Sequence, residues 1–382
     1  MTDIITSKAD PPSGKDPGPG RARRLPAIGS LQGYIGLLLV IALGIATKGD
    51  VFLNETNLTN AIGAFSSRGI LAVGVTLVIL TAGIDLSVGS VLGFCSMTAA
   101  MLLVHQDMPP WQIVPVCMLV GAGFGLLNGI GTTWLGIQSF VMTLAMLSIA
   151  RGLDRQISDN VSVGTQIVGS DGKLSPNSEA FASLGTPGNN VLEGFPLLGS
   201  AGIYYPVLAL IVVCVVFHLI LSKTRFGRHV YAVGGNPTAA RLSGINVTGV
   251  TIAVFALSGM LAGFAGPIDA AYSASADPQA GTSYELDAIA AAVIGGTSLA
   301  GGKGTIAGTF IGALILTLLD NVLGLNAVSD NWQLVIKGLI VVVAVVLQRP
   351  GFLTGAGRPV RRLAGRGRGG GEATAPSGEA RG

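Results

Sequence analysis

The chain has 382 residues and a formal net charge of +3; 49% of its residues are hydrophobic and only 11% are charged. Soluble domains carry about 25% charged residues, so this composition argues against a water-soluble globule. The apolar residues form blocks of about 20, which is the length of a helix that spans roughly 30 Å of hydrocarbon. The sequence therefore predicts an all-α, polytopic membrane protein.

The two ends of the chain differ from its apolar middle. Residues 1–30 combine Pro, Gly, Asp and basic residues with too few apolar groups to offset the entropy of ordering, which predicts a disordered cytoplasmic tail. Residues 349–382 are rich in Gly, Arg and Ala and predict a second disordered, basic cytoplasmic tail, which anionic membrane lipid attracts. Residues 31–348 form the predicted transmembrane domain.

Ten apolar blocks predict about ten transmembrane helices. They are residues 31–47, 61–82, 85–104, 111–135, 138–153, 203–222, 248–270, 284–300, 305–323 and 332–348. The second and third blocks leave little room for two crossings, because residues 69–104 contain one charge, Asp85, and two crossings need about 40 residues. One of these helices is predicted to be short or broken, or to begin nearer Asn60.

The positions of Lys and Arg indicate the orientation. With the N-terminus inside, 17 of the 23 basic residues fall in predicted cytoplasmic segments. Both termini and the loop 223–247 are then cytoplasmic. Residues 154–200 form the largest external segment, either a solvated loop or a docking surface for an extracytoplasmic partner. Five spans on each side of this segment are compatible with an inverted five-helix repeat.

The loop 223–247 contains signals for a short helix outside the membrane. Asn236 suits an N-cap, Pro237 suits the first helical position, Arg241 lies in the last turn, and Gly244 suits the position after the C-cap. A helix this short needs a surface to pack against, either its own bundle or another protein. The residues of this candidate docking helix are Gly235, Asn236, Pro237, Ala239, Ala240, Arg241 and Gly244.

Several polar residues inside the apolar blocks are candidates for a translocation path. Asp85 and Ser87 either cap the third span or present a carboxylate to the path, where it can accept hydrogen bonds from a solute. Glu285 and Asp287 are either stabilised by the helix dipole at the start of the eighth span, or they line the external opening of the path. Further path candidates, each equally explained by a hydrogen bond between helices, are Asn128, Gln138 and Asn321. Arg68 and Lys337 are expected to extend from near a membrane boundary.

No pattern for catalysis or metal binding is found in the sequence. The histidines His105, His218 and His229 lie far apart, and the three cysteines lie inside apolar blocks. The Gly-rich stretch 296–305 does not fit the phosphate-binding pattern, because Gly304 follows Lys303 where Ser or Thr is required. We therefore expect a transport subunit without a catalytic residue, metal or cofactor of its own, and without a nucleic-acid partner.

Three longer strings carry a resemblance to a known family. They are LAVGVTLVILTAGIDLSVGS (71–90), TRFGRHVYAVGGNPTAARLSGINV (224–247) and YELDAIAAAVIGGTSLAGGKGTIAGTFIGALIL (284–316). Over residues 31–348 the chain resembles the ribose-type sugar permeases of the ABC transporter superfamily. The docking helix matches their coupling signature only in part, because Thr238 stands where an acidic residue is typical.

The resemblance implies a membrane-spanning subunit that imports a monosaccharide such as ribose or xylose across the plasma (inner) membrane. It also implies a second permease subunit, an extracytoplasmic sugar-binding protein, and an ATPase subunit that binds ATP and Mg²⁺ and receives the docking helix. Two other transporter classes stay open: a permease for branched-chain amino acids, and an ion-driven secondary transporter with Asp85 as its coupling carboxylate. A polytopic membrane enzyme is disfavoured, because no catalytic constellation is visible.

Overall fold

The computed structural model describes residues 28–169, 172–185 and 204–347. Most of both predicted tails lies outside this range, although the first helix already begins at Ile28. The described part is almost entirely helical, and seven of its helices are long and apolar enough to cross a membrane. The prediction of an all-α, polytopic membrane protein is therefore confirmed. The count of ten spans stays a prediction.

The elements follow one another along the chain with two very short strands among the helices. They are α1 (Ile28–Phe52), α2 (Glu55–Leu80), α3 (Val88–Gln106), α4 (Pro110–Thr133), α5 (Ser139–Ile157), β1 (Val163–Gly164), α6 (Pro176–Ala182), α7 (Tyr205–Lys223), α8 (Arg225–Gly235), α9 (Pro237–Leu242), α10 (Val247–Tyr272), β2 (Ser275–Ala276), α11 (Tyr284–Ile294), α12 (Ile306–Leu325) and α13 (Asp330–Leu347). Strands β1 and β2 pair in antiparallel fashion.

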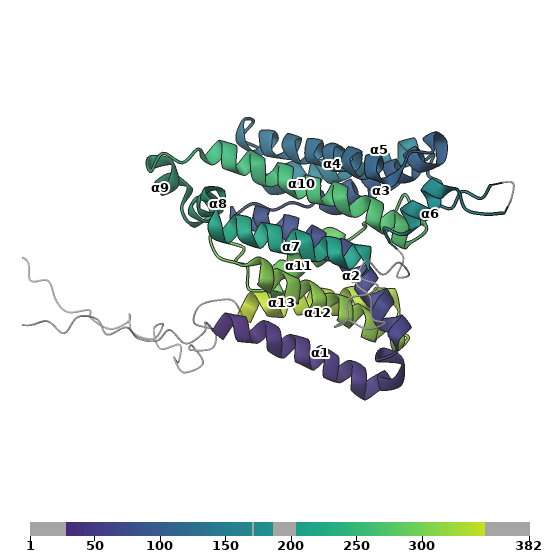
Figure 1. The fold of residues 1–382 in the computed structure, drawn as a ribbon. Helices are drawn as coiled ribbons and strands as arrows, with labels where there is room; N and C mark the ends of the chain where they lie inside the picture. The colour runs from purple at the N-terminus through teal and green to yellow at the C-terminus, as the bar shows by residue number, and fades with distance from the viewer. Residues whose placement is uncertain (1–27, 170–171, 186–203, 348–382) are drawn as a thin grey trace, which may run out of the picture.

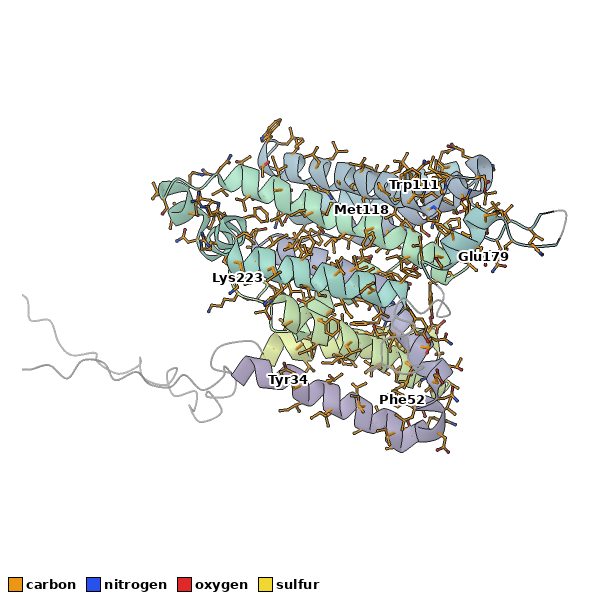
Figure 2. All side chains as sticks on the ribbon, in the orientation of Figure 1. Tyr34, Phe52, Trp111, Met118, Glu179 and Lys223 are labelled. Carbon is orange, nitrogen blue, oxygen red and sulfur yellow. The ribbon has the colours of Figure 1, made fainter. Side chains whose placement is uncertain are left out.

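The long helices run along one common direction and form an elongated bundle (Figure 1). Helices α8 and α9 lie at one end of the bundle, and α6 lies at the opposite end; we call these the α9 end and the α6 end. In Figure 2, Lys223 and Tyr34 mark the α9 side, whereas Glu179 and Phe52 mark the α6 side. Helix α1 therefore starts on the same side as α9, as the predicted topology requires.

Helix α2 forms the centre of the bundle. Every residue from Gly69 to Leu80 is buried, whereas α1 and α7 keep much of their apolar surface exposed. Such exposed apolar surface is expected where lipid surrounds a membrane protein. The exposed faces of α1 and α7 therefore mark the lipid-facing surface, and α2 marks the interior.

Glycines bring α4 and α10 into direct backbone contact. A Cβ added at Gly125 would collide with the backbone oxygen of Phe255, and one added at Gly259 would lie 2.9 Å from the Cα of Gly125. Only residues without a side chain permit this close approach. It adds van der Waals contacts between the helices, and these stabilise helix association in lipid, where the hydrophobic effect does not. The glycine spacing Gly125-xxx-Gly129 and Gly259-xxx-Gly263 in the sequence thus serves helix packing.

Some predicted boundaries are corrected by the structure. Helix α3 begins at Val88 rather than at Asp85. Helix α11 ends at Ile294, so the eighth block forms a helix of 11 residues instead of a span that reaches residue 300. The reason is backbone geometry, because Gly296 has a φ of +90° and residues 297–305 continue without helix. Helix α5 continues to Ile157, so the predicted external segment starts at Ser158.

Two helices begin inside the bundle after irregular segments that enter from opposite ends. Residues 81–87 follow α2 from the α9 end and lead into α3, and residues 273–283 follow α10 from the α6 end and lead into α11. The two helix starts meet where Gly89 packs against the backbone of Gly281. This opposed pair is what an inverted repeat requires at these positions; the repeat itself stays a prediction.

Candidate functional site

The candidate docking helix is present as α9. The Asn236 side chain accepts a hydrogen bond of 2.9 Å from the backbone N–H of Ala239, and Pro237 occupies the first turn. At the other end the backbone N–H of Ile245 donates to the carbonyl of Ala240, and Gly244 has a φ of +82°. The local cap signals in the sequence therefore account for both ends of this six-residue helix.

Helix α9 presents one large apolar side chain outward. Leu242 is 86% exposed, whereas Ala240 is buried. Gly235, Asn236, Pro237, Ala239, Arg241 and Gly244 are exposed as well. The sequence analysis did not single out Leu242, although a leucine at the end of a capped helix outside the membrane is a recognisable signal. Leu242 is the most exposed large apolar side chain of the described residues.

Helix α8 connects α9 to the core, and the sequence analysis did not predict it. Its N-cap is Thr224, whose hydroxyl accepts a hydrogen bond from the backbone N–H of Gly227. Tyr231 donates a hydrogen bond of 2.8 Å to the carbonyl of Gly304. Gly234 packs directly on the backbone of Leu80, the last residue of α2. Helix α8 therefore links α9 directly to the end of the central helix.

The Gly-rich stretch 296–305 forms a turn that supports this contact. The backbone N–H of Gly302 donates a hydrogen bond of 2.9 Å to the carbonyl of Leu80, which satisfies one of the free carbonyls at the end of α2. Gly301 and Gly302 have φ values of +81° and +70°, which explains why glycine is needed here. The stretch is therefore a tight turn between helices.

Asp85 lies at the centre of a buried polar network. One carboxylate oxygen accepts hydrogen bonds from the backbone N–H of Ser87 at 3.0 Å and from its hydroxyl at 2.7 Å. The other oxygen accepts a hydrogen bond of 3.1 Å from the Ser258 hydroxyl on α10. Asn128 on α4 donates to the Ser87 hydroxyl at 2.9 Å. Asp85 is only 1% exposed, so these contacts favour the structural explanation of the carboxylate over a path-facing one.

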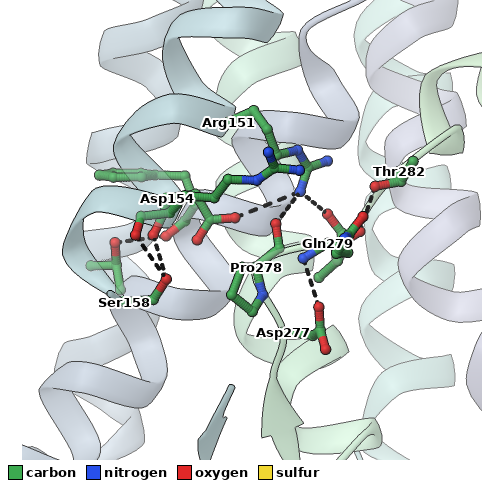
Figure 3. Close-up of polar contacts among 11 residues, drawn as sticks. Arg151, Asp154, Ser158, Asp277, Pro278, Gln279 and Thr282 are labelled. Atoms are coloured by element: carbon green, nitrogen blue, oxygen red, sulfur yellow. Dashed lines mark hydrogen bonds and ion pairs between the residues drawn. The ribbon is translucent and has the colours of Figure 1, made fainter. Parts of the chain in front are cut away.

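A second polar cluster joins α5 to the segment after α10 (Figure 3). The Arg151 guanidinium donates hydrogen bonds of 3.0 and 2.7 Å to the carbonyls of Pro278 and Ala280, and it lies 3.6 Å from a carboxylate oxygen of Asp154. Asp154 is fully buried, and neither of its carboxylate oxygens has a hydrogen-bond partner among the described residues. Arg151 is thus the group that neutralises Asp154 and holds the irregular segment in place.

The remaining path candidates are dispersed. Glu285 lies near Gly89 at the meeting point of α3 and α11, and Asp287 faces α13. Gln138 is exposed at the N-cap position of α5, at the α9 end of the bundle and away from Glu285 and Asp287. Asn321 exchanges hydrogen bonds of 3.0 and 2.7 Å with Asn57. The structure therefore brings together Asp85, Ser87 and Asn128 but leaves Gln138 apart from them.

Four charged side chains from four helices form what we call the ion-pair chain: Arg68 on α2, Asp320 on α12, Lys337 on α13 and Asp287 on α11. The Arg68–Asp320, Asp320–Lys337 and Lys337–Asp287 contacts are 2.7, 2.9 and 3.2 Å long. Arg68 and Lys337 each pair with a carboxylate of another helix, and their position relative to a membrane boundary stays a prediction. The sequence analysis missed Asp320, whose partners lie far away in the sequence.

Within the described ranges, no group of three or more His, Cys, Asp or Glu side chains is arranged to hold a metal ion. Many of the polar groups bond to one another or to the backbone, although both carboxylate oxygens of Asp154 and one of Asp320 have no hydrogen-bond partner among the described residues. The arrangement as a whole consists of a lipid-facing helical bundle, two broken helices that meet at its centre, and a small capped helix that projects from one end. These features define a polytopic membrane permease.

Comparisons with known proteins agree with that class. Residues 57–345 match the family described as branched-chain amino acid transport system / permease component, and the chain belongs to this family. No solved structure matches the chain.

The similar proteins with known names are sugar import permeases. The chain is 41% identical over 315 residues to the ribose import permease protein RbsC of Haemophilus influenzae, a match that covers 82% of this chain and 91% of that protein. It is 41% identical over 316 residues to the RbsC protein of Escherichia coli, covering 83% and 92%. It is 36% identical over 325 residues to the galactose/methyl galactoside import permease protein MglC of Escherichia coli, covering 82% and 92%. The resemblance to ribose-type permeases is confirmed.

Proposed function

We propose that this chain is the membrane-spanning permease subunit of an ATP-driven importer for a monosaccharide such as ribose, xylose or a related sugar. The observation that carries the proposal is the identity of 41% with ribose import permeases over more than four fifths of the chain. The similar galactose/methyl galactoside permease is less identical, at 36%. The higher identity with the ribose permeases favours a pentose over a hexose as the imported sugar.

The hydrolysis of ATP is assigned to a partner chain. The sequence contains no phosphate-binding loop. The stretch that comes nearest to one, residues 296–305, forms the turn that contacts the end of α2. In the proposed complex the exposed α9 enters a groove of the ATPase subunit, and Leu242 is its apolar contact. Movement of the ATPase then reaches α2 through α8.

The proposed assembly places α9 and both chain ends in the cytoplasm of a cell whose plasma (inner) membrane holds the bundle. A second permease subunit completes the path, membrane lipid covers the apolar faces, and an extracytoplasmic sugar-binding protein docks at the α6 end. The small sheet of β1 and β2 and helix α6 belong to that surface. A neutral polyol needs only weak binding in such a path, since its affinity is supplied by the delivering protein.

The test is uptake of radiolabelled sugar by cells that lack their own ribose permease and express this chain with its ATPase and binding protein. Ribose or xylose should accumulate, and depletion of ATP should stop the accumulation. Uptake of leucine without uptake of any sugar would instead assign a branched-chain amino acid permease. Collapse of uptake by a protonophore at constant ATP would assign an ion-driven transporter.

The docking role of α9 has its own test. Leu242→Asp should reduce sugar uptake by about tenfold or more while the chain still accumulates in the membrane, because a charge in an apolar contact is costly to desolvate. The matched control is Leu135→Asp, which changes an exposed leucine between α4 and α5, at the same end of the bundle but outside α9. Equal uptake by the two variants would remove the assignment of α9 as the coupling helix.

A further inference from the structure

The ion-pair chain lies deep in the bundle. Arg68 is the middle residue of the 26-residue helix α2, which at 1.5 Å per residue places its Cα about 20 Å from each end of the helix. Tyr284 at the start of α11 lies over the Arg68 guanidinium, with 5.0 Å between that group and the ring centroid. Four charges and an aromatic ring thus gather between α2, α11, α12 and α13.

The uncovered side of the ion-pair chain does not face lipid. Between 15% and 25% of the surface of each of its side chains is left exposed by the rest of this chain. Charged groups exposed to hydrocarbon are costly, and those found in membrane proteins face the bundle interior or a water-filled cavity. The exposed side of the ion-pair chain therefore faces water or another polar surface.

The chemistry of this cluster suits a neutral polyol. Its two cations donate hydrogen bonds and its two carboxylates accept them, so a hydroxyl, which does both, can replace an ion-pair contact while each charged group keeps a hydrogen bond. One carboxylate oxygen of Asp320 is buried and has no hydrogen-bond partner among the described residues, so it is free to accept one. Tyr284 offers an aromatic face beside these groups.

In the described conformation the ion-pair chain has no room for a sugar beside it. Arg68, Asp287 and Thr317 line a cavity of about 10 Å³, which has room for roughly one water. A sugar ring needs a wider opening here than the described conformation provides. In that open state the ion-pair contacts would be exchanged for contacts with sugar hydroxyls.

We propose that the ion-pair chain of Arg68, Asp320, Lys337 and Asp287 is a polyol-binding site of the translocation path. The inference rests on the proposed sugar import, and it names the residues that contact the sugar inside the membrane. The competing explanation is that the ion pairs only fasten α13 to the bundle.

Thiol labelling tests the site without relying on transport. Cys95, Cys117 and Cys214 are replaced by Ala, and Thr317→Cys is introduced into the full chain in membrane vesicles with its partner subunits. The probe is a charged methanethiosulfonate reagent, applied with and without ribose or galactose in the tens-of-millimolar range expected for weak binding. The matched control is Thr309→Cys on the same helix, whose native hydroxyl is buried against that of Thr76.

We expect Thr317→Cys to react at least about tenfold faster than Thr309→Cys, and we expect either sugar, but not leucine, to slow the reaction. Equal labelling of the two positions, or labelling that sugar does not change, would overturn the site. If the wild-type importer moves no sugar while ribose or galactose still protects Thr317→Cys, the proposed import fails and the polyol site stands. If the importer moves sugar without such protection, the polyol site fails and the proposed import stands.

A variant in which the four charged residues are replaced by apolar ones distinguishes sugar binding from a purely structural role of the ion pairs. A variant with Arg68→Met, Asp287→Leu, Asp320→Leu and Lys337→Met removes all charges together, and such replacements of buried ion pairs are often neutral for stability. We expect membrane abundance close to that of the wild type and sugar uptake reduced by about tenfold or more. Uptake at the wild-type rate would show that the ion pairs only fasten α13. If this variant fails to accumulate, the labelling result decides.

Discussion

The contact between α4 and α10 offers a sharp test of the fold. Gly125 and Gly123 lie on the same helix, but only Gly125 faces α10. A Cβ at Gly125 would collide with the backbone oxygen of Phe255 and lie 3.0 Å from the Cα of Ala256, whereas a Cβ at Gly123 would meet nothing within 4 Å. Both obstacles at Gly125 are backbone atoms, so no flexible side chain can move aside.

The magnitude follows from a comparison of the two alanine variants. Both gain the same helix propensity of about 1 kcal/mol, which cancels in the difference. Overpacking costs typically about 1–3 kcal/mol, so Gly125→Ala should be less stable than Gly123→Ala by about 2 kcal/mol. Because the unfolding entropy is about 2.1 cal/mol/K per residue, that difference corresponds to a shift of roughly 2–3 °C in the melting temperature of a chain of this size.

The assay is thermal unfolding of the two purified variants in the same detergent, followed by gel filtration of the fraction that stays folded. The wild-type chain should melt close to Gly123→Ala and above Gly125→Ala. Melting temperatures of the two variants within about 1 °C of each other would refute the close packing of α4 on α10.

Three other substitutions test the polar contacts and the docking helix. Asp85→Ala should lower stability by about 1–3 kcal/mol, because its serine partners lose their acceptor, whereas Asp85→Asn should lower it less; the same melting assay checks both. Arg151→Met should cost about 3–5 kcal/mol, because it leaves Asp154 buried without a cation; normal abundance of this variant in membranes would contradict the role assigned to Arg151. Gly244→Ala should strain the end of α9 by roughly 1–2 kcal/mol and reduce sugar uptake, whereas Gly235→Ala, with open space around it and no positive φ, should not.

The parts of the structure that depend on local sequence were predictable. Both ends of α9 follow from Asn236, Pro237 and Gly244, because capping is decided within a few residues. The lengths of most apolar blocks likewise match the long helices to within a few residues. The shortness of α11 was not predictable from hydrophobicity, because its apolar run continues beyond the point where Gly296 changes the backbone direction.

The polar contacts were beyond reach of the sequence because their partners are remote. Asp320 pairs with Arg68, which lies 252 residues earlier, and Asp85 bonds to Ser258, which lies 173 residues later. A charge in an apolar block therefore looks unpaired in the sequence. The pairing of Arg68 with Asp320 was not predicted for this reason, since the sequence alone suggests only that such a side chain extends to a membrane boundary.

The irregular segment 81–87 has a consequence for how the protein is made. Its backbone is satisfied by later parts of the chain: Ile84 donates to the Ser139 hydroxyl and accepts from the Thr143 hydroxyl, which lie 55 and 59 residues further on. A backbone without partners is not tolerated in hydrocarbon. Both backbone groups of Ile84 therefore gain these partners only after α5 has been synthesised. We expect the segment 81–87 to reach its final position together with α5.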